Sequence, residues 1–296
     1  MDALRLTQPR RLTLPVASRW GGGRMAVLDF GDPDRPVDLV FVHANGFNAM
    51  TYRTLLGPLS GSLRVWAPDL RGHGATALPA EPRGRRGWAD HRDDLVALLD
   101  ALEGPPVALA GHSMGATAAL LAAAARPGRV SRLVLLDPVI WTRWSQALLG
   151  LPLFDRLARR IPLVRAALRR RAVFDSRDQA LAAYRGRGAF RGWPDAMLAD
   201  YLSDGLVETG AGFALACPPE WEASNYAAQA HDPWGALRRI DRPVRILKAA
   251  HGSTCHVPER PRGLPHVTVQ TVADGTHFFP MLQVDVARDA LFDAAV

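Results

Sequence analysis

Short, continuous apolar runs bounded by turn residues recur along the chain, and each predicts a β-strand. Such runs are typical of strands that are buried on both faces, as in a parallel sheet. Two amphipathic runs at 11–16 and 24–30 come first, and the glycines at 21–23 between them predict a hairpin or meander. The buried runs follow at 38–43, 63–69, 106–111, 132–137, 244–249 and 267–272.

Helical patterns lie between several of these runs. Leucines recur at helical spacing within 88–102, and an alanine-rich segment at 114–125 follows the strand at 106–111. Strand, helix and strand in alternation predict right-handed crossovers and a mostly parallel central sheet. We therefore expect an α/β fold with helices on both faces of the sheet.

One interruption of this alternation is large. Between the sixth strand, which ends near 137, and the next strand, which begins near 244, no segment has a convincing strand pattern. The interruption is rich in Leu, Ala, Arg and Trp, and it is long enough for roughly four or five helices. We expect a core domain formed by residues 1–140 and 242–296, with a helical cap of residues 141–241 inserted after the sixth strand.

Composition excludes several classes of protein. The chain has 296 residues, of which 48% are hydrophobic and 22% charged, as in ordinary soluble globular proteins. Its two cysteines, Cys217 and Cys255, cannot build a disulfide scaffold or a four-cysteine zinc site. Because no long apolar run and no apolar N-terminal segment occurs, we expect no stable membrane association and a cytoplasmic location.

The net charge of +7 changes this picture little. Lys248 is the only lysine, so the excess is almost entirely arginine, a bias typical of GC-rich coding sequences. The arginines are scattered and lack the aromatic-interleaved stripes of nucleic-acid-binding proteins. We therefore expect a small-molecule substrate and no nucleic-acid partner, and the oligomeric state stays open.

Candidate chemistry begins with Gly111-His112-Ser113-Met114-Gly115, which fits the pattern G-x-S-x-G. The pattern by itself is weak, but here it follows a predicted strand and opens a predicted helix. This context places Ser113 on a sharp strand-to-helix turn, where small neighbours relieve crowding of the backbone. The unpaired amides at the start of the helix favour a negatively charged oxygen nearby.

Four blocks in the same order resemble the α/β-hydrolase family, over nearly the whole chain. They are His43-Ala44-Asn45-Gly46-Phe47, which is similar to the oxyanion loop with alanine in place of its first glycine; Asp69-Leu70-Arg71-Gly72-His73-Gly74, which matches D-x-R-G-x-G; the 111–115 turn; and Asp274-Gly275-Thr276-His277-Phe278, beyond the last strand. The subgroup that the chain resembles comprises cap-bearing hydrolases of the epoxide-hydrolase-like and esterase-like kind.

The resemblance implies a role for each block. Ser113 is the expected nucleophile and His277 its base, and the backbone amides of Asn45 and Met114 are the expected oxyanion hole. His43 and His73 are expected to brace the oxyanion loop and the D-x-R-G-x-G turn. This chemistry needs neither a metal nor a cofactor, and the histidine spacings suggest no metal site.

The carboxylate that orients the histidine is missing from its usual position in this sequence. Most of the family carry it after the penultimate strand, but residues 248–255 contain no Asp or Glu. Some members carry it after the strand that follows the nucleophile helix, where this chain has Asp137. Asp137 is therefore the expected acid, and the alternative is that Asp137 only forms a turn at the strand end.

The insertion bears on the substrate. Five of the eight tryptophans lie in it, and an aromatic lid over a serine favours an apolar acyl or alcohol group. We expect Phe47, Trp141, Trp144 and Trp221 to contact substrate, although each tryptophan could instead pack the cap onto the core.

The sequence thus predicts a serine hydrolase that cleaves an ester, thioester or lactone through an acyl-enzyme at Ser113. A carbon–carbon bond hydrolase or a cofactor-free haloperoxidase would use the same triad, and a non-catalytic ligand-binding protein would use the same fold. Epoxide hydrolases and haloalkane dehalogenases carry an aspartate at the elbow, which disfavours them here.

Overall fold

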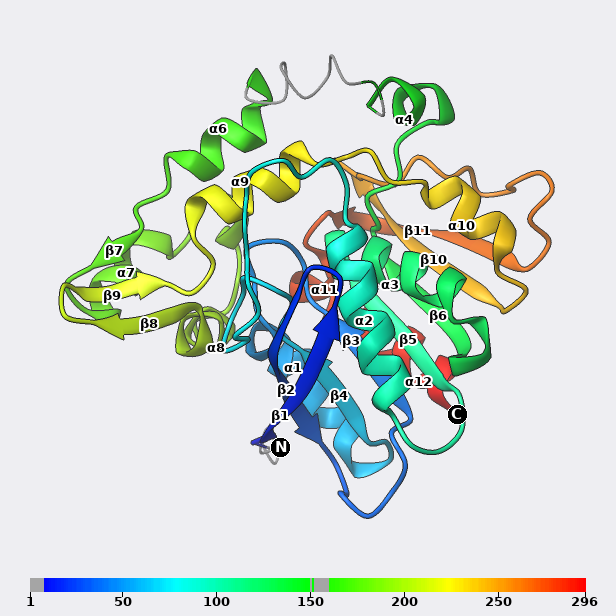
Figure 1. Cartoon of the computed structure of the whole chain (residues 1–296), viewed down its shortest axis with the longest axis horizontal. Helices are drawn as coiled ribbons and strands as arrows, with labels where there is room; N and C mark the ends of the chain where they lie inside the picture. The colour runs from blue at the N-terminus through cyan, green and yellow to red at the C-terminus, as the bar shows by residue number, and fades with distance from the viewer. Residues whose placement is uncertain (1–7, 150, 152–159) are drawn as a thin grey trace.

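The central sheet of the protein has eight strands in the order β1-β2-β4-β3-β5-β6-β10-β11 (Figure 1). The computed structural model describes residues 8–149, 151 and 160–296. β1 and β2 form an antiparallel hairpin, β2 runs antiparallel to β4, and all other neighbours are parallel, which confirms the predicted sheet. The strands are β1 (Arg10–Ser18), β2 (Gly21–Phe30), β3 (Leu39–Val42), β4 (Val65–Pro68), β5 (Val107–His112), β6 (Val130–Leu136), β10 (Val244–His251) and β11 (Val267–Thr276).

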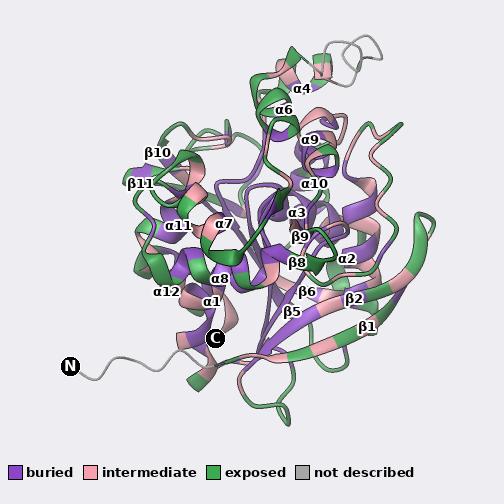
Figure 2. Ribbon diagram, turned by 90° about the vertical axis from the view of Figure 1, so that its left-hand side faces the viewer, coloured by how far each residue is buried: buried purple, intermediate pink, exposed green. Residues whose placement is uncertain are grey.

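Helices cover both faces of this sheet, as predicted. Successive residues of β3 point to opposite faces: Val40 and Val42 pack in one apolar cluster, and Leu39 and Phe41 pack in another. β3, β4 and β5 are buried at every residue, and Figure 2 shows buried strands at the centre of the molecule. The first face packs against α2 (Ala89–Ala101), α3 (Met114–Ala125) and α10 (Pro233–Arg239), and the second against α1 (Arg53–Leu56), α11 (Phe279–Leu282) and α12 (Val284–Ala295).

The segment between β6 and β10 lies across one end of the sheet (Figure 1). Its contacts reach loops that follow the strands: Trp221 donates a hydrogen bond to the carbonyl of Arg71, and Asn225 donates one to the side chain of Asn45. The segment therefore covers the carboxyl ends of the parallel strands. Among the described residues of this segment, the α-helices apart from α10 are α4 (Arg143–Leu149), α6 (Pro162–Leu168), α7 (Arg177–Tyr184), α8 (Asp195–Gly205) and α9 (Pro219–Ala227).

The expectation that this segment has no strands is wrong. It contains a three-stranded antiparallel sheet in the order β7-β9-β8, formed by β7 (Val173–Phe174), β8 (Leu206–Thr209) and β9 (Gly212–Leu215). Strands of two to four residues are too short to show an alternating pattern. Gly212 has φ +113, and a Cβ there would lie 2.4 Å from the carbonyl oxygen of Phe174, so a glycine is required for the pairing.

The helix α10 packs with the core although it precedes the expected domain boundary at residue 242. Trp234 and Leu237 belong to the same apolar cluster as α2 and α3. The division into residues 1–140 with 242–296 and residues 141–241 stays a prediction, and the packing of α10 favours an earlier end of the cap. Across the described ranges, none of the helices is long and apolar enough to cross a membrane.

Candidate active site

Ser113 occupies a strained turn between β5 and α3. Its φ of 56° and ψ of −121° lie outside the regions that L residues normally adopt. The neighbouring glycines leave no space for a side chain, since a Cβ on Gly115 would lie 2.3 Å from the carbonyl oxygen of His43. The same close approach places the loop after β3 directly against the start of α3. Ser113 is therefore held between the first turn of a helix and the predicted oxyanion loop.

The structure brings Ser113, His277 and Asp137 together although 164 and 140 residues separate the pairs. His277 Nε2 lies 3.0 Å from Ser113 Oγ, and His277 Nδ1 lies 2.5 Å from Asp137 Oδ2. Asp137 is fully buried, whereas the side chain of His277 is 20% exposed and Ser113 is 8% exposed. Exposure along this chain of hydrogen bonds is thus greater at Ser113 and His277 than at Asp137.

Residues 249–254, at the end of β10 and in the loop after it, contain no acid and surround Asp137 with hydrogen-bond donors. Oδ1 accepts from the backbone N–H of Ala249 at 2.9 Å and from the hydroxyl of Ser253 at 2.5 Å, and Oδ2 accepts from the N–H of Thr254 at 3.1 Å. Burial raises the pKa of the Asp137 carboxyl, but its bonds with His277, Ser253 and Ala249 outweigh burial and lower the pKa below its ordinary value. The group therefore stays ionised in the interior.

Two histidines brace the loop after β3, as the sequence predicts. His43 Nε2 accepts a hydrogen bond from the N–H of Leu70 at 2.9 Å, and His73 Nε2 accepts one from the N–H of Gly46 at 3.1 Å. Each Nδ1 contacts a backbone carbonyl, so each ring is neutral with its proton on Nδ1. Burial lowers the pKa of His43 to about 4 and that of His73 well below its ordinary value. The brace joins the D-x-R-G-x-G turn to the predicted oxyanion loop.

The cap holds this loop from the other side. The Asn45 side chain donates to the carbonyl of Glu222 at 3.0 Å and accepts from Asn225 Nδ2 at 2.8 Å. Both partners lie on α9. The side chain of Asn45 is therefore engaged by the cap, which leaves its backbone N–H as the group that could face a reacting oxygen beside Met114.

Phe47 lies among aromatic side chains next to His277. Its ring centroid is 5.3 Å from that of Trp193, 5.7 Å from that of Tyr201 and 6.2 Å from that of Phe278. The Phe278 ring in turn lies 5.2 Å from the His277 ring. Sequence reasoning named only Phe47 of this cluster as a substrate contact, because the other rings come from the turn after β11 and from the cap.

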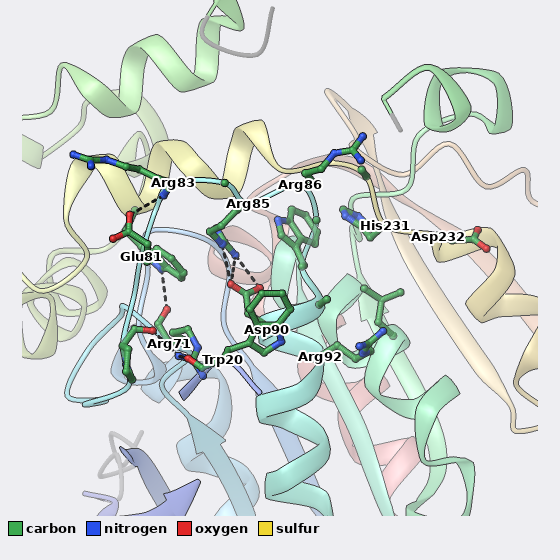
Figure 3. Close-up of a pocket in the computed structure, with 18 of the residues that line it drawn as sticks. Trp20, Arg71, Glu81, Arg83, Arg85, Arg86, Asp90, Arg92, His231 and Asp232 are labelled. Carbon is green, nitrogen blue, oxygen red and sulfur yellow. Dashed lines mark hydrogen bonds and ion pairs between the residues drawn. The ribbon is translucent and has the colours of Figure 1, made fainter. Parts of the chain in front are cut away.

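The three tryptophans predicted to contact substrate have other surroundings. Trp221 is buried against Arg71 and Arg85 on the side of α2, and it lines a cavity of about 690 Å³ whose walls do not include Ser113, His277 or Asp137 (Figure 3). Trp144 is 85% exposed, and Trp141 is partly buried with its indole N–H bonded to Gln229. The ring of Phe278 links Phe47 to His277, whereas none of these tryptophans makes a hydrogen bond or ring contact with Ser113, His277 or Asp137.

No group of three or more His, Cys, Asp or Glu side chains in the described part of the chain is arranged to hold a metal ion. Charged side chains near this site instead pair with other side chains of the protein. The carboxylate of Glu222, which lies close to Gly46, pairs with Arg170. The guanidinium of Arg170 also donates a hydrogen bond to the hydroxyl of Tyr201 at 2.8 Å.

Known proteins share both the sequence pattern and the fold. A family model described as the alpha/beta hydrolase family matches residues 39–294. The magnesium-chelatase 30 kDa subunit of Rhodobacter capsulatus is 28% identical over 273 residues, which cover 90% of this chain and 89% of that protein. The 2-hydroxymuconate semialdehyde hydrolase of a Pseudomonas species is 38% identical over 102 residues, which cover 33% of this chain and 35% of that protein.

Solved structures agree on the fold. The crystal structure of E-2-(acetamidomethylene)succinate hydrolase superposes with a TM-score of 0.73 at 20% identity, covering 96% of this chain and 98% of that one. A thioesterase domain from the curacin biosynthetic pathway also reaches a TM-score of 0.73, at 16% identity, covering 96% of this chain and 99% of that one. With the strained turn at Ser113, the sheet order and the family match in agreement, this chain is an enzyme of the alpha/beta hydrolase family.

Proposed function

We propose that this enzyme is a serine hydrolase that cleaves an ester, thioester or lactone bond of a largely apolar small molecule. The observation that carries the proposal is the continuous hydrogen-bonded chain from Ser113 Oγ through the His277 ring to Asp137. An ionised Asp137 accepts a hydrogen bond from the protonated Nδ1 of His277, so Nε2 is left unprotonated and can accept the serine proton. Ser113 is a weak nucleophile without such a base.

The reaction then follows from the geometry. Ser113 Oγ attacks the substrate carbonyl as its proton passes to His277 Nε2, and the carbonyl oxygen becomes negatively charged. The N–H groups of Met114 and Asn45, at the start of α3 and in the loop against it, stabilise this oxygen. His277 gives its proton to the leaving alcohol or thiol, and water activated by the same histidine releases the acyl group.

The aromatic cluster around Phe47 supports the apolar character of the substrate. The rings of Trp193, Tyr201 and Phe278 surround that of Phe47 with centroids 5.3, 5.7 and 6.2 Å away, and none of these rings carries a formal charge. Such walls favour an apolar acyl or alcohol group through the burial of its surface.

A labelling experiment tests the proposed nucleophile. The wild-type protein should react covalently with a fluorophosphonate probe, and Ser113→Ala should not, while Ser145→Ala, a change in a cap helix, should label normally. The wild type should also hydrolyse p-nitrophenyl esters, and a series of acyl chain lengths would define the preferred substrate. A wild type that is folded but neither labels nor hydrolyses would point to a ligand-binding protein on the same fold.

Hydrolysis of a carbon–carbon bond is the second candidate. It is favoured by the local sequence similarity to two hydrolases, the 2-hydroxymuconate semialdehyde hydrolase described above and the 2-hydroxy-6-oxo-2,4-heptadienoate hydrolase of Pseudomonas putida. The two candidates are separated by giving the same preparation a p-nitrophenyl ester and a vinylogous 1,5-diketone. Turnover of the diketone at a higher kcat/KM than any ester would favour carbon–carbon cleavage.

A further inference from the structure

A buried chain of hydrogen bonds runs from the loop after β3 to the loop that carries His277. The N–H of Ala44 donates to the hydroxyl of Tyr52 at 3.1 Å. That hydroxyl lies 2.8 Å from His112 Nδ1, and His112 Nε2 lies 2.8 Å from the carbonyl oxygen of His277. Tyr52 is 1% exposed and His112 is fully buried. The ring of His112 therefore contacts the backbone of the proposed histidine base.

The two ends of the chain determine where every proton lies. A backbone N–H can only donate and a backbone carbonyl can only accept. Tyr52 therefore accepts from Ala44 and donates its own proton to His112 Nδ1, and His112 donates its Nε2 proton to His277. His112 must be neutral in this arrangement. Burial, and to a lesser extent the neighbouring His277, lowers the pKa of His112 to about 3, which is consistent with that state.

This chain connects the three parts of the proposed reaction. Ala44 precedes Asn45, whose N–H is a proposed oxyanion donor, and His112 precedes Ser113 in the chain. His277 is the proposed base. The rings are also in contact, with centroids 5.0 Å apart for His112 and His277 and 6.0 Å apart for Tyr52 and His112. His112 contacts the loop of His277 directly and reaches the loop after β3 through Tyr52, so the two side chains together can set the distance between these loops.

We propose that His112 and Tyr52 are positioning residues that hold the base and the oxyanion loop at the spacing that acyl transfer requires. The inference rests on the proposed function, since it assigns roles around the same triad. Neither residue touches the substrate. The reaction is sensitive to this spacing because a displacement of about 1 Å in a reacting group can cost about a hundredfold in rate.

The test replaces the two residues while retaining their volume. His112→Phe removes both hydrogen bonds and should lower kcat by about thirtyfold to a hundredfold with KM changed by less than about threefold. His112→Gln restores a donor near the position of Nε2 and should recover about tenfold of that loss. Tyr52→Phe should lower kcat by about tenfold. His251→Phe, at an exposed position at the end of β10, is the matched control.

A spectroscopic measurement separates positioning from loss of fold and does not depend on turnover. In ¹⁵N-labelled wild type, His112 should be the neutral Nε2–H tautomer at pH 7, and the proton between His277 and Asp137 should give a low-field resonance. That resonance should shift or broaden in His112→Phe and stay in place in His251→Phe.

The results that would overturn the positioning role differ from those that would overturn the proposed function. A His112→Phe enzyme with kcat within threefold of wild type, an Nδ1–H tautomer at His112, or equal activity of the Phe and Gln variants would each overturn the positioning role. If His112→Phe does not fold, Tyr52→Phe and the wild-type tautomer decide the question. If the wild type lacks hydrolase activity but has the expected tautomer and resonance, the proposed function fails and the geometric coupling stands.

Discussion

Replacing Asp137 with Asn should abolish most of the activity by changing which nitrogen of His277 carries the proton. The carboxylate accepts from Ala249 and Ser253 on Oδ1 and from Thr254 and His277 on Oδ2. Asparagine has one acceptor oxygen and one donor group, so only one of these two sides can keep its bonds. Each side includes a backbone N–H that cannot rotate, that of Ala249 at 2.9 Å from Oδ1 and that of Thr254 at 3.1 Å from Oδ2. The bond from Ala249 is the shorter of the two, so the oxygen of the new amide is expected to stay on that side.

The amide nitrogen would then face His277 Nδ1, which must become an acceptor. The ring proton moves to Nε2, and Nε2 can no longer accept from Ser113. In a serine protease triad the same change lowers kcat by about 10⁴-fold, or about 5.4 kcal/mol at 1.36 kcal/mol per power of ten. The N–H of Thr254 also loses its acceptor, which should lower the free energy of unfolding by about 1–3 kcal/mol.

The measurement is kcat for a p-nitrophenyl ester at pH 8 together with the thermal unfolding of each variant. Asp195→Asn is the control, since Asp195 is an exposed carboxylate that pairs with Arg185 on the cap. A loss of less than tenfold in a folded Asp137→Asn variant would refute the argument and would leave a Ser113–His277 dyad. A variant that loses its fold rather than its turnover would make Asp137 a structural residue.

Three further predictions follow from particular contacts. Gly115→Ala should prevent correct folding of the nucleophile turn, because its Cβ would lie 2.3 Å from a backbone oxygen; a normal melting temperature would contradict this. The free energy of unfolding should fall as the pH drops from 6.5 toward 4, because the pKa of His43 is lowered to about 4 in the folded protein and the unfolded chain binds the proton more readily. Each such histidine contributes at most about 1.4 kcal/mol per pH unit. An unfolding temperature that does not change with pH over that interval would exclude the effect. Phe47→Ala should raise KM for long-chain esters by about tenfold while Trp144→Ala changes it by less than twofold, and the reverse order in steady-state kinetics would restore Trp144 as a substrate contact.

The sheet and the turn at Ser113 could be predicted from the sequence. Strands buried on both faces are recognisable because most of their residues are apolar, and the two-residue period that places Val40 and Leu39 in opposite clusters is a property of any strand. The position of Ser113 is equally local, since the glycines on either side and the helix that follows are all within a few residues. His277 could be placed because it follows the last strand, and parallel strands end at one edge.

The surroundings of these residues depend on contacts between segments far apart in the chain, which the sequence pattern does not reveal. Asp137, Ser253 and Thr254 meet because β6 and β10 are neighbours in the sheet, a pairing between strands more than a hundred residues apart. The aromatic rings beside His277 come from segments that the cap brings over the sheet, and apolar burial has no direction that a sequence pattern could reveal. For the same reason Trp221, which composition alone could not distinguish from a pocket residue, proved to pack against Arg71 on the side of α2.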